Sequence, residues 1–191
     1  MKRSAVLRHL RGMDLDIDLR RADADGLVAS ARDGDATAFS AIVDTFHGEM
    51  VRVAFVVCGD VEMARDAAQN AWIKAWRSLH GLREPSRLRP WLLSIAANEA
   101  RQVARAQRRR PVRSIDALEI EPGAAGPSPI STDLVVALGR LDPSDRALIA
   151  LRYLAGVETA DIARATGRTA SGTRTRLSRL LAQLREDLDH A

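Results

Sequence analysis

The sequence predicts an all-α protein with two small helical domains joined by a flexible linker. Apolar residues recur every three or four positions through residues 25–109 and again through residues 131–191, which is the spacing of helices that each bury one face. Between them, residues 110–130 lose this spacing and contain four prolines, a composition typical of a linker. Residues 1–24 fit neither domain, and we expect a loose N-terminal extension there.

Composition restricts the class of protein. The single cysteine, Cys58, excludes an internal disulfide and favours a reducing compartment, the cytoplasm. Four scattered histidines give no metal-ligand spacing, so we expect neither a metal nor another cofactor. No apolar run approaches the ~20 residues of a membrane span, and we therefore expect no membrane insertion.

Positive charge is concentrated in two segments. The net charge is +4, but residues 101–113 hold six arginines and no acid, and residues 162–185 hold six more. The rest of the chain is net acidic. Two basic segments on an acidic body predict two separate contacts with a polyanion.

The first domain carries two faces that could bind partners. In the helix expected over residues 61–79, alanines with Trp72 and Trp76 form the inward stripe. The opposite side carries an acid, two amides and one apolar residue: Asp66, Gln69, Asn70 and Ile73. This side is either a docking strip with an apolar centre and a polar rim or an ordinary solvated face with one outward isoleucine.

A loop rich in turn formers and arginine follows over residues 80–89, and Pro90 suits the first turn of a helix that runs to about residue 109. An amide and three arginines fall along one side of that helix: Asn98, Arg101, Arg105 and Arg108. Such a stripe can bind phosphates and contact a base edge.

The second domain ends in a predicted helix-turn-helix over residues 157–188. Gly167 suits the left-handed turn, Thr169 can cap the following helix, and that helix has an apolar stripe on one side and arginines on the others. A helix of this kind fits the major groove of DNA. Two short helices around a glycine turn are also common as plain packing units, with a solvated arginine face.

These residues together resemble the extracytoplasmic-function group of bacterial sigma factors, the promoter-recognition subunits of RNA polymerase. Residues 64–72 are similar to the family's Asp-x-x-Gln-x-x-aromatic motif, and residues 91–98 match its Trp-Leu-x-x-Ile-Ala-x-Asn signature. Residues 141–153 and 174–179 align in the second domain. The resemblance covers about residues 25–188.

The resemblance implies three contact sets. The strip Asp66, Gln69, Asn70 and Ile73 would bind the β′ subunit of core polymerase. The minus-ten element would be bound and opened, with a flipped base held by the loop, by Arg83, Arg87, Asn98, Arg101, Arg105 and Arg108. The second domain would sit on the β subunit and read the minus-thirty-five element through Arg168, Thr169, Ser171, Arg174, Thr175, Arg176 and Arg179. Many members of the family are also held by an anti-sigma factor.

One departure from the family lies in the second helix of the helix-turn-helix. Ser171-Gly172-Thr173 replaces the common Gly-Thr-Val, and glycine in a first helical turn costs about 1 kcal/mol relative to alanine. Either a close approach of the backbone to DNA or neutral drift would explain it.

Two other functions are compatible with parts of the sequence. One is a dimeric helix-turn-helix transcriptional regulator, with residues 25–109 as an N-terminal effector domain. The other is an enzyme acting on nucleic acid, which the sequence disfavours because no paired carboxylates, metal-ligand cluster or activated nucleophile stands out. A sigma factor needs no catalytic residue, because the polymerase performs the chemistry, and we expect a non-enzymatic protein.

Overall fold

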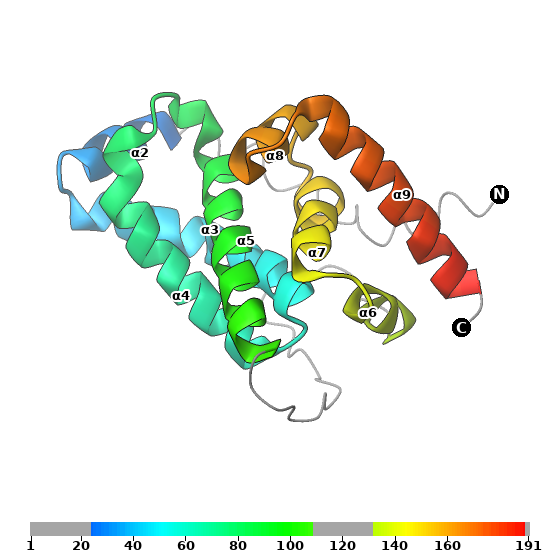
Figure 1. Cartoon of the computed structure of the whole chain (residues 1–191). Helices are drawn as coiled ribbons and strands as arrows, with labels where there is room; N and C mark the ends of the chain where they lie inside the picture. The colour runs from blue at the N-terminus through cyan, green and yellow to red at the C-terminus, as the bar shows by residue number, and fades with distance from the viewer. Residues whose placement is uncertain (1–23, 109–131, 190–191) are drawn as a thin grey trace.

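The computed structural model describes residues 24–108 and 132–189, and every regular element in these ranges is helical (Figure 1). The predicted all-α class is confirmed. The expected N-terminal extension and linker lie outside the described residues, apart from Ala24. None of the described helices combines the length and the apolar character needed to cross a membrane.

Four helices form the first half of the structure: α2 over Ala24–Arg32, α3 over Ala36–Cys58, α4 over Val61–Ser78 and α5 over Leu88–Arg108. Asp35 caps α3 by accepting hydrogen bonds from two backbone amides of its first turn, and Asp60 caps α4 by accepting one from the amide of Met63. Gly59, with φ 76°, ends α3. These local signals explain why the breaks fall where the sequence predicts them.

Small residues allow α4 to approach its neighbours closely. The buried alanines of this helix are Ala64, Ala67, Ala68, Ala71 and Ala75. Trp72 is also buried and donates its indole N–H to Nδ1 of His47 at 3.2 Å. The predicted inward stripe is wrong at Trp76, which is 43% exposed. Phe39 lies edge-on to both tryptophans, so Trp76 packs one side of its ring on Phe39 while it stays partly exposed.

Four helices form the second half: α6 over Thr132–Gly139, α7 over Pro143–Ile149, α8 over Thr159–Thr166 and α9 over Ala170–Asp189. Asp142 caps α7, with Pro143 in its first turn, as the sequence predicts. A π-helical turn over Ala150–Leu154 then follows where the apolar spacing suggests an unbroken helix. In this turn the amide of Ala155 donates to the carbonyl of Ala150 at 2.9 Å.

The helix-turn-helix is formed by α8 and α9. Gly167 has the expected left-handed backbone, with φ 66°. The hydroxyl of Thr169 accepts a hydrogen bond from the amide of Gly172 at 3.1 Å and so caps α9. The inner face of α9 is formed by Thr173, Leu177, Leu180 and Leu184.

The two halves pack against each other. Helix α7 contacts both α3 and α5 (Figure 1), and buried side chains of both halves form one continuous apolar cluster. Polar contacts join the halves as well. Arg105 of α5 donates to the hydroxyl of Ser144 at 2.8 Å, and Arg87 pairs with Asp161 of α8 at 2.6 Å. The helix-turn-helix therefore lies beside the loop and the basic helix of the first half.

Candidate nucleic-acid and polymerase interface

The predicted docking strip lies on the outer face of α4. Asp66, Gln69, Asn70 and Ile73 are all exposed. Ile73 is 46% exposed, and Trp76 adds a second large apolar side chain one turn further along. Within the described ranges, Asp66 makes no ion pair. The strip thus exposes polar groups around an apolar centre. Trp76 is an addition, since the sequence predicts it on the inward side of the helix.

Three of the predicted minus-ten residues line a single open pocket of about 360 Å³. These are Asn98, Arg101 and Arg105, and they lie on one side of α5. The same helix adds Ile95, Glu99 and Gln102 to the lining, and α4 adds Lys74 and Ser78. Arg108 is the last residue of α5, and its side chain lies outside the described part of the chain.

The positive charge of Arg101 is only partly balanced by nearby negative charge. Burial lowers its pKa, and the nearby positive charges of Arg105 and Arg168 lower it further, against an opposing effect of Asp142. Its Nη1 donates to Oδ1 of Asn98 at 2.9 Å. Its Nε is buried and finds no acceptor among the described residues. A phosphate bound beside this side chain would relieve the charge repulsion among the three arginines.

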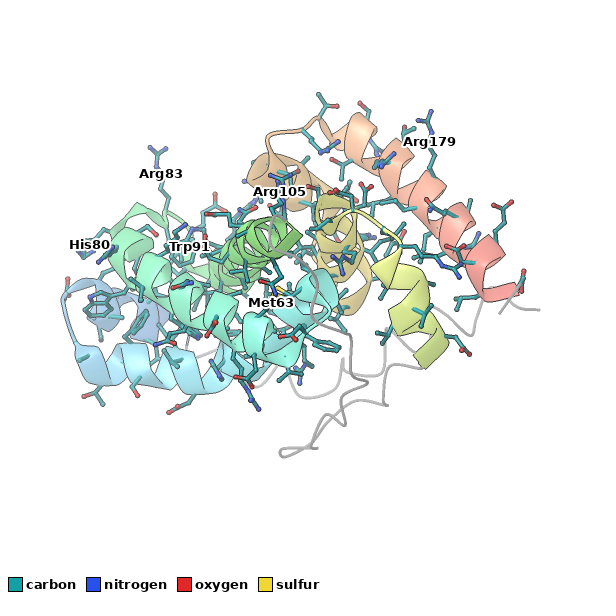
Figure 2. The ribbon with its side chains drawn as sticks, turned by 60° about the horizontal axis from the view of Figure 1, so that its bottom comes forward. Met63, His80, Arg83, Trp91, Arg105 and Arg179 are labelled. Carbon is teal, nitrogen blue, oxygen red and sulfur yellow. The ribbon has the colours of Figure 1, made fainter. Side chains whose placement is uncertain are left out.

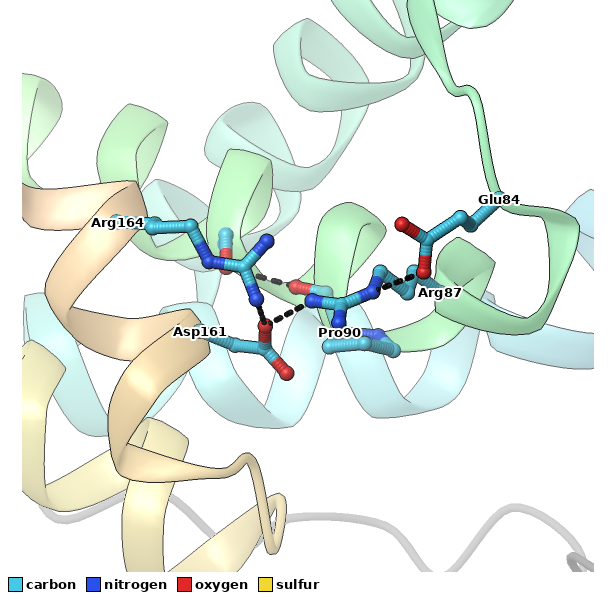
Figure 3. Close-up of polar contacts among 6 residues, drawn as sticks. Glu84, Arg87, Pro90, Asp161 and Arg164 are labelled. Carbon is cyan, nitrogen blue, oxygen red and sulfur yellow. Dashed lines mark hydrogen bonds and ion pairs between the residues drawn. The ribbon is translucent and has the colours of Figure 1, made fainter.

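The two loop arginines differ in their surroundings. Arg83 is exposed and points away from the body, on the same side of the view as Arg179 of α9, with Arg105 between them (Figure 2). Arg87 instead donates through Nε to Glu84 and through Nη1 to Asp161, each at 2.6 Å, and Asp161 also pairs with Arg164 (Figure 3). The hydrogen bond with Glu84 and the charge of Asp161 raise the pKa of Arg87. Among residues 24–108 and 132–189, Arg83 has no polar partner, whereas Arg87 is engaged by two carboxylates.

The helix-turn-helix presents its predicted contact residues to solvent. The seven exposed residues are Arg168, Thr169, Ser171, Arg174, Thr175, Arg176 and Arg179. Arg176 also forms an ion pair with Asp145 of α7. Nε of Arg176 donates to Oδ1 of Asp145 at 2.9 Å, and Nη2 donates to Oδ2. The hydrogen bond with Asp145 raises the pKa of Arg176. Sequence spacing does not predict this partner, because Asp145 lies on another helix.

The structure gives a local reason for glycine at position 172, in the first turn of α9. A Cβ built at this position would lie 2.9 Å from the hydroxyl oxygen of Thr169, which is closer than side-chain carbons approach such an atom. That hydroxyl caps α9 through the amide of Gly172 itself. A larger residue would therefore displace the cap.

Two family models match the chain in order. The model described as "Sigma-70 region 2" matches residues 42–110, and that described as "Sigma-70, region 4" matches residues 131–184. Together they cover more than half of the chain. The chain belongs to the sigma-70 family of RNA polymerase sigma factors, within the extracytoplasmic-function group.

Particular relatives agree with this assignment. The chain is 29% identical to the probable RNA polymerase sigma factor RfaY of Xanthomonas campestris over 81% of this chain and 41% of that protein. It is 38% identical to the ECF RNA polymerase sigma-E factor of Escherichia coli over 50% of each chain. It thus spans about half the length of these curated relatives. The sigma factor RpoE of Bartonella quintana, solved with the anti-sigma factor NepR, shares the fold, with a TM-score of 0.63 at 24% identity over 79% of this chain and 96% of that one.

Proposed function

We propose that this protein is an alternative sigma factor that binds core RNA polymerase and directs initiation at its own promoters by recognising and helping to open promoter DNA. The ordered pair of sigma-70 regions, each with exposed arginines, carries the proposal. A dimeric regulator would need an effector domain over residues 25–109, and the region 2 match occupies most of that range.

The docking strip on α4 is the proposed contact with the β′ subunit. Asp66 and Gln69 offer an ionic and a hydrogen-bonding group, while Ile73 supplies the apolar centre that a protein interface needs. The second half would contact the β subunit. An anti-sigma factor is a further proposed partner, since a relative of this fold was solved with one.

The minus-ten element would be held by the loop and by α5. Arg83 is exposed in the loop, and Arg101 and Arg105 line the pocket with Asn98; Arg87 and Arg108 complete the proposed set. Guanidinium groups around a groove follow the phosphates of an unwound strand and give salt-dependent affinity.

The minus-thirty-five element would be read by α9. The first turns of a recognition helix meet base edges in the major groove, and here they expose Ser171, Arg174 and Thr175. Arg176 is presented in a fixed orientation by Asp145. Such pre-orientation favours bidentate contact with guanine.

Both promoter elements can be held at once only when the two halves separate. The elements are about 25 base pairs apart, or about 85 Å at 3.4 Å per base pair. A packed chain of this length has a radius of gyration of about 16 Å. The contacts between the halves also occupy Arg87 and Arg105, two of the proposed minus-ten residues. We infer that the packed arrangement is the state away from the promoter.

As a sigma factor, the protein would catalyse no reaction itself. The polymerase forms the phosphodiester bonds, and the sigma factor would act beside it in the cytoplasm.

The test is transcription by purified components. Core polymerase with this protein should initiate at specific sites on genomic templates, at positions that core polymerase alone does not use, as mapped by sequencing of transcript 5′ ends. An unchanged map would refute the proposal. Tight binding of the protein without polymerase to a palindromic duplex, as a dimer by light scattering, would favour the regulator instead.

A further inference from the structure

The pocket between α4 and α5 contains one buried carboxylate among its cations. Glu99 is 9% exposed, and its Oε1 accepts hydrogen bonds from Nζ of Lys74 at 2.5 Å and from Nε2 of Gln102 at 3.0 Å. Both donors use the same oxygen. Within the described residues, Oε2 accepts no hydrogen bond, and it is not sealed from solvent. Since Glu99 lines the pocket, this second oxygen is an acceptor that a ligand can reach.

The remaining lining does not suit a phosphate at this spot. Arg101 and Arg105 lie on the same side of α5 and provide positive charge, but a phosphate next to Oε2 would meet a negative charge. A neutral group that donates a hydrogen bond would be accepted there. A nucleotide meets both requirements, because its base can face Glu99 while its phosphates face the arginines.

At the base position that carries N4 of cytosine and N6 of adenine, a carboxylate can accept a hydrogen bond from the amino group, whereas thymine presents the acceptor O4 and guanine the acceptor O6 at the corresponding place. Ile95 adds an apolar wall to the same pocket. The volume of about 360 Å³ lies at the low end of small-molecule sites, as expected for a single planar group.

We propose that Glu99 reads one base of the minus-ten strand, accepting a hydrogen bond at Oε2 from the exocyclic amino group of cytosine or adenine while Lys74 and Gln102 hold its other oxygen. This inference rests on the proposed sigma-factor function and adds to it a specificity-determining residue. Asn98 has a different role, because its Oδ1 already accepts from Arg101.

The geometry makes a directional prediction for Glu99→Gln. Lys74 and Gln102 are both donors, so the carbonyl oxygen of the new amide must stay with them. Its NH₂ group then faces the pocket, where it would oppose an amino group and pair with a carbonyl. The substitution should therefore exchange the preference for cytosine or adenine for a preference for thymine or guanine.

The experiment uses holoenzyme reconstituted from core polymerase and the full chain. Single-stranded DNA with a randomised minus-ten segment is captured, and the bound fraction is sequenced. Wild-type holoenzyme should enrich cytosine or adenine over thymine and guanine about tenfold at one position. E99Q should reverse that position and leave the others unchanged. Asp44→Asn is the matched control, since this exposed residue on α3 loses one charge outside the pocket, and it should behave as wild type.

A second arm needs no variant. Replacing the selected base by an analogue without the amino group, purine for adenine or the 4-deoxy analogue for cytosine, should weaken binding to wild-type holoenzyme by about tenfold. Two results would overturn the role of Glu99 and leave the sigma-factor function standing. In the first, E99Q holoenzyme enriches the same bases at the same positions as wild-type holoenzyme. In the second, the analogue without the amino group binds wild-type holoenzyme as tightly as the natural base does. No enrichment over core polymerase at any position would overturn both.

Discussion

Replacement of Arg176 by alanine is expected to destabilise the protein as well as to weaken DNA binding. The side chain of Asp145 is 9% exposed and is held by Arg176 in a bidentate ion pair. Removing one partner of a buried pair leaves an uncompensated charge and costs about 3–5 kcal/mol. Two features reduce this value. The side chain of Arg176 is 44% exposed, and the N-terminus of α7, where Asp145 lies, favours a negative charge by about 0.3–1 kcal/mol. We therefore expect a loss of about 2–3 kcal/mol.

Urea unfolding followed by circular dichroism measures this loss. The double substitution Asp145→Ala with Arg176→Ala removes the stranded carboxylate, and it should recover most of the stability while still binding minus-thirty-five duplex weakly. Arg179→Ala is the control, since this exposed side chain should matter for DNA binding with a stability change within about 0.5 kcal/mol. If R176A keeps wild-type stability, or if the double variant is as unstable as the single one, the reasoning from a buried carboxylate is wrong.

Three further outcomes are expected. Alanine at both Asp66 and Gln69 should weaken capture by core polymerase and leave the helical circular-dichroism signal unchanged; equal capture would reject the docking strip. Asp161→Asn removes the ion pair with Arg87 between the halves, and it should shift the protein a few-fold at most toward the separated form, because the pair is partly exposed. Energy transfer between dyes on α3 and α9 would report this shift, and the difference from wild type should vanish in high salt. Burial raises the pKa of the Cys58 thiol from 9.0 to about 12, so a disulfide reagent at pH 8 should label it far more slowly in folded than in unfolded protein. Because the unfolded thiol ionises first, this group's contribution to stability is complete below pH 9 and is lost toward pH 12, and faster labelling of folded protein would contradict its burial.

Local features of the fold could be predicted from the sequence, whereas contacts between helices could not. Asp60 and Gly167 act through neighbours in the chain, so their caps and turns follow from short-range chemistry. The partnership of Lys74 with Glu99 joins two helices that the sequence separates by a loop. Periodicity indicates which side of each helix faces inward, but it does not say which side chains meet. The exposure of Trp76 differs from the prediction for the same reason.

The candidate site also has features that the sequence predicts and features that it does not. Exposed positions on α4 and α9 follow from helical spacing, and the structure finds them exposed. The acids that engage the arginines, Asp145 and Asp161, depend on how α7 and α8 pack.

The apolar cluster shared by the two halves makes the protein sensitive to temperature. Burial of apolar surface is driven mainly by entropy near 25 °C, and it weakens on cooling. Contacts of Leu148 and Ile149, which are buried in that cluster, should then hold the halves together less firmly. Under the proposed function, cooling would favour the extended form of the protein, which alone can span both promoter elements.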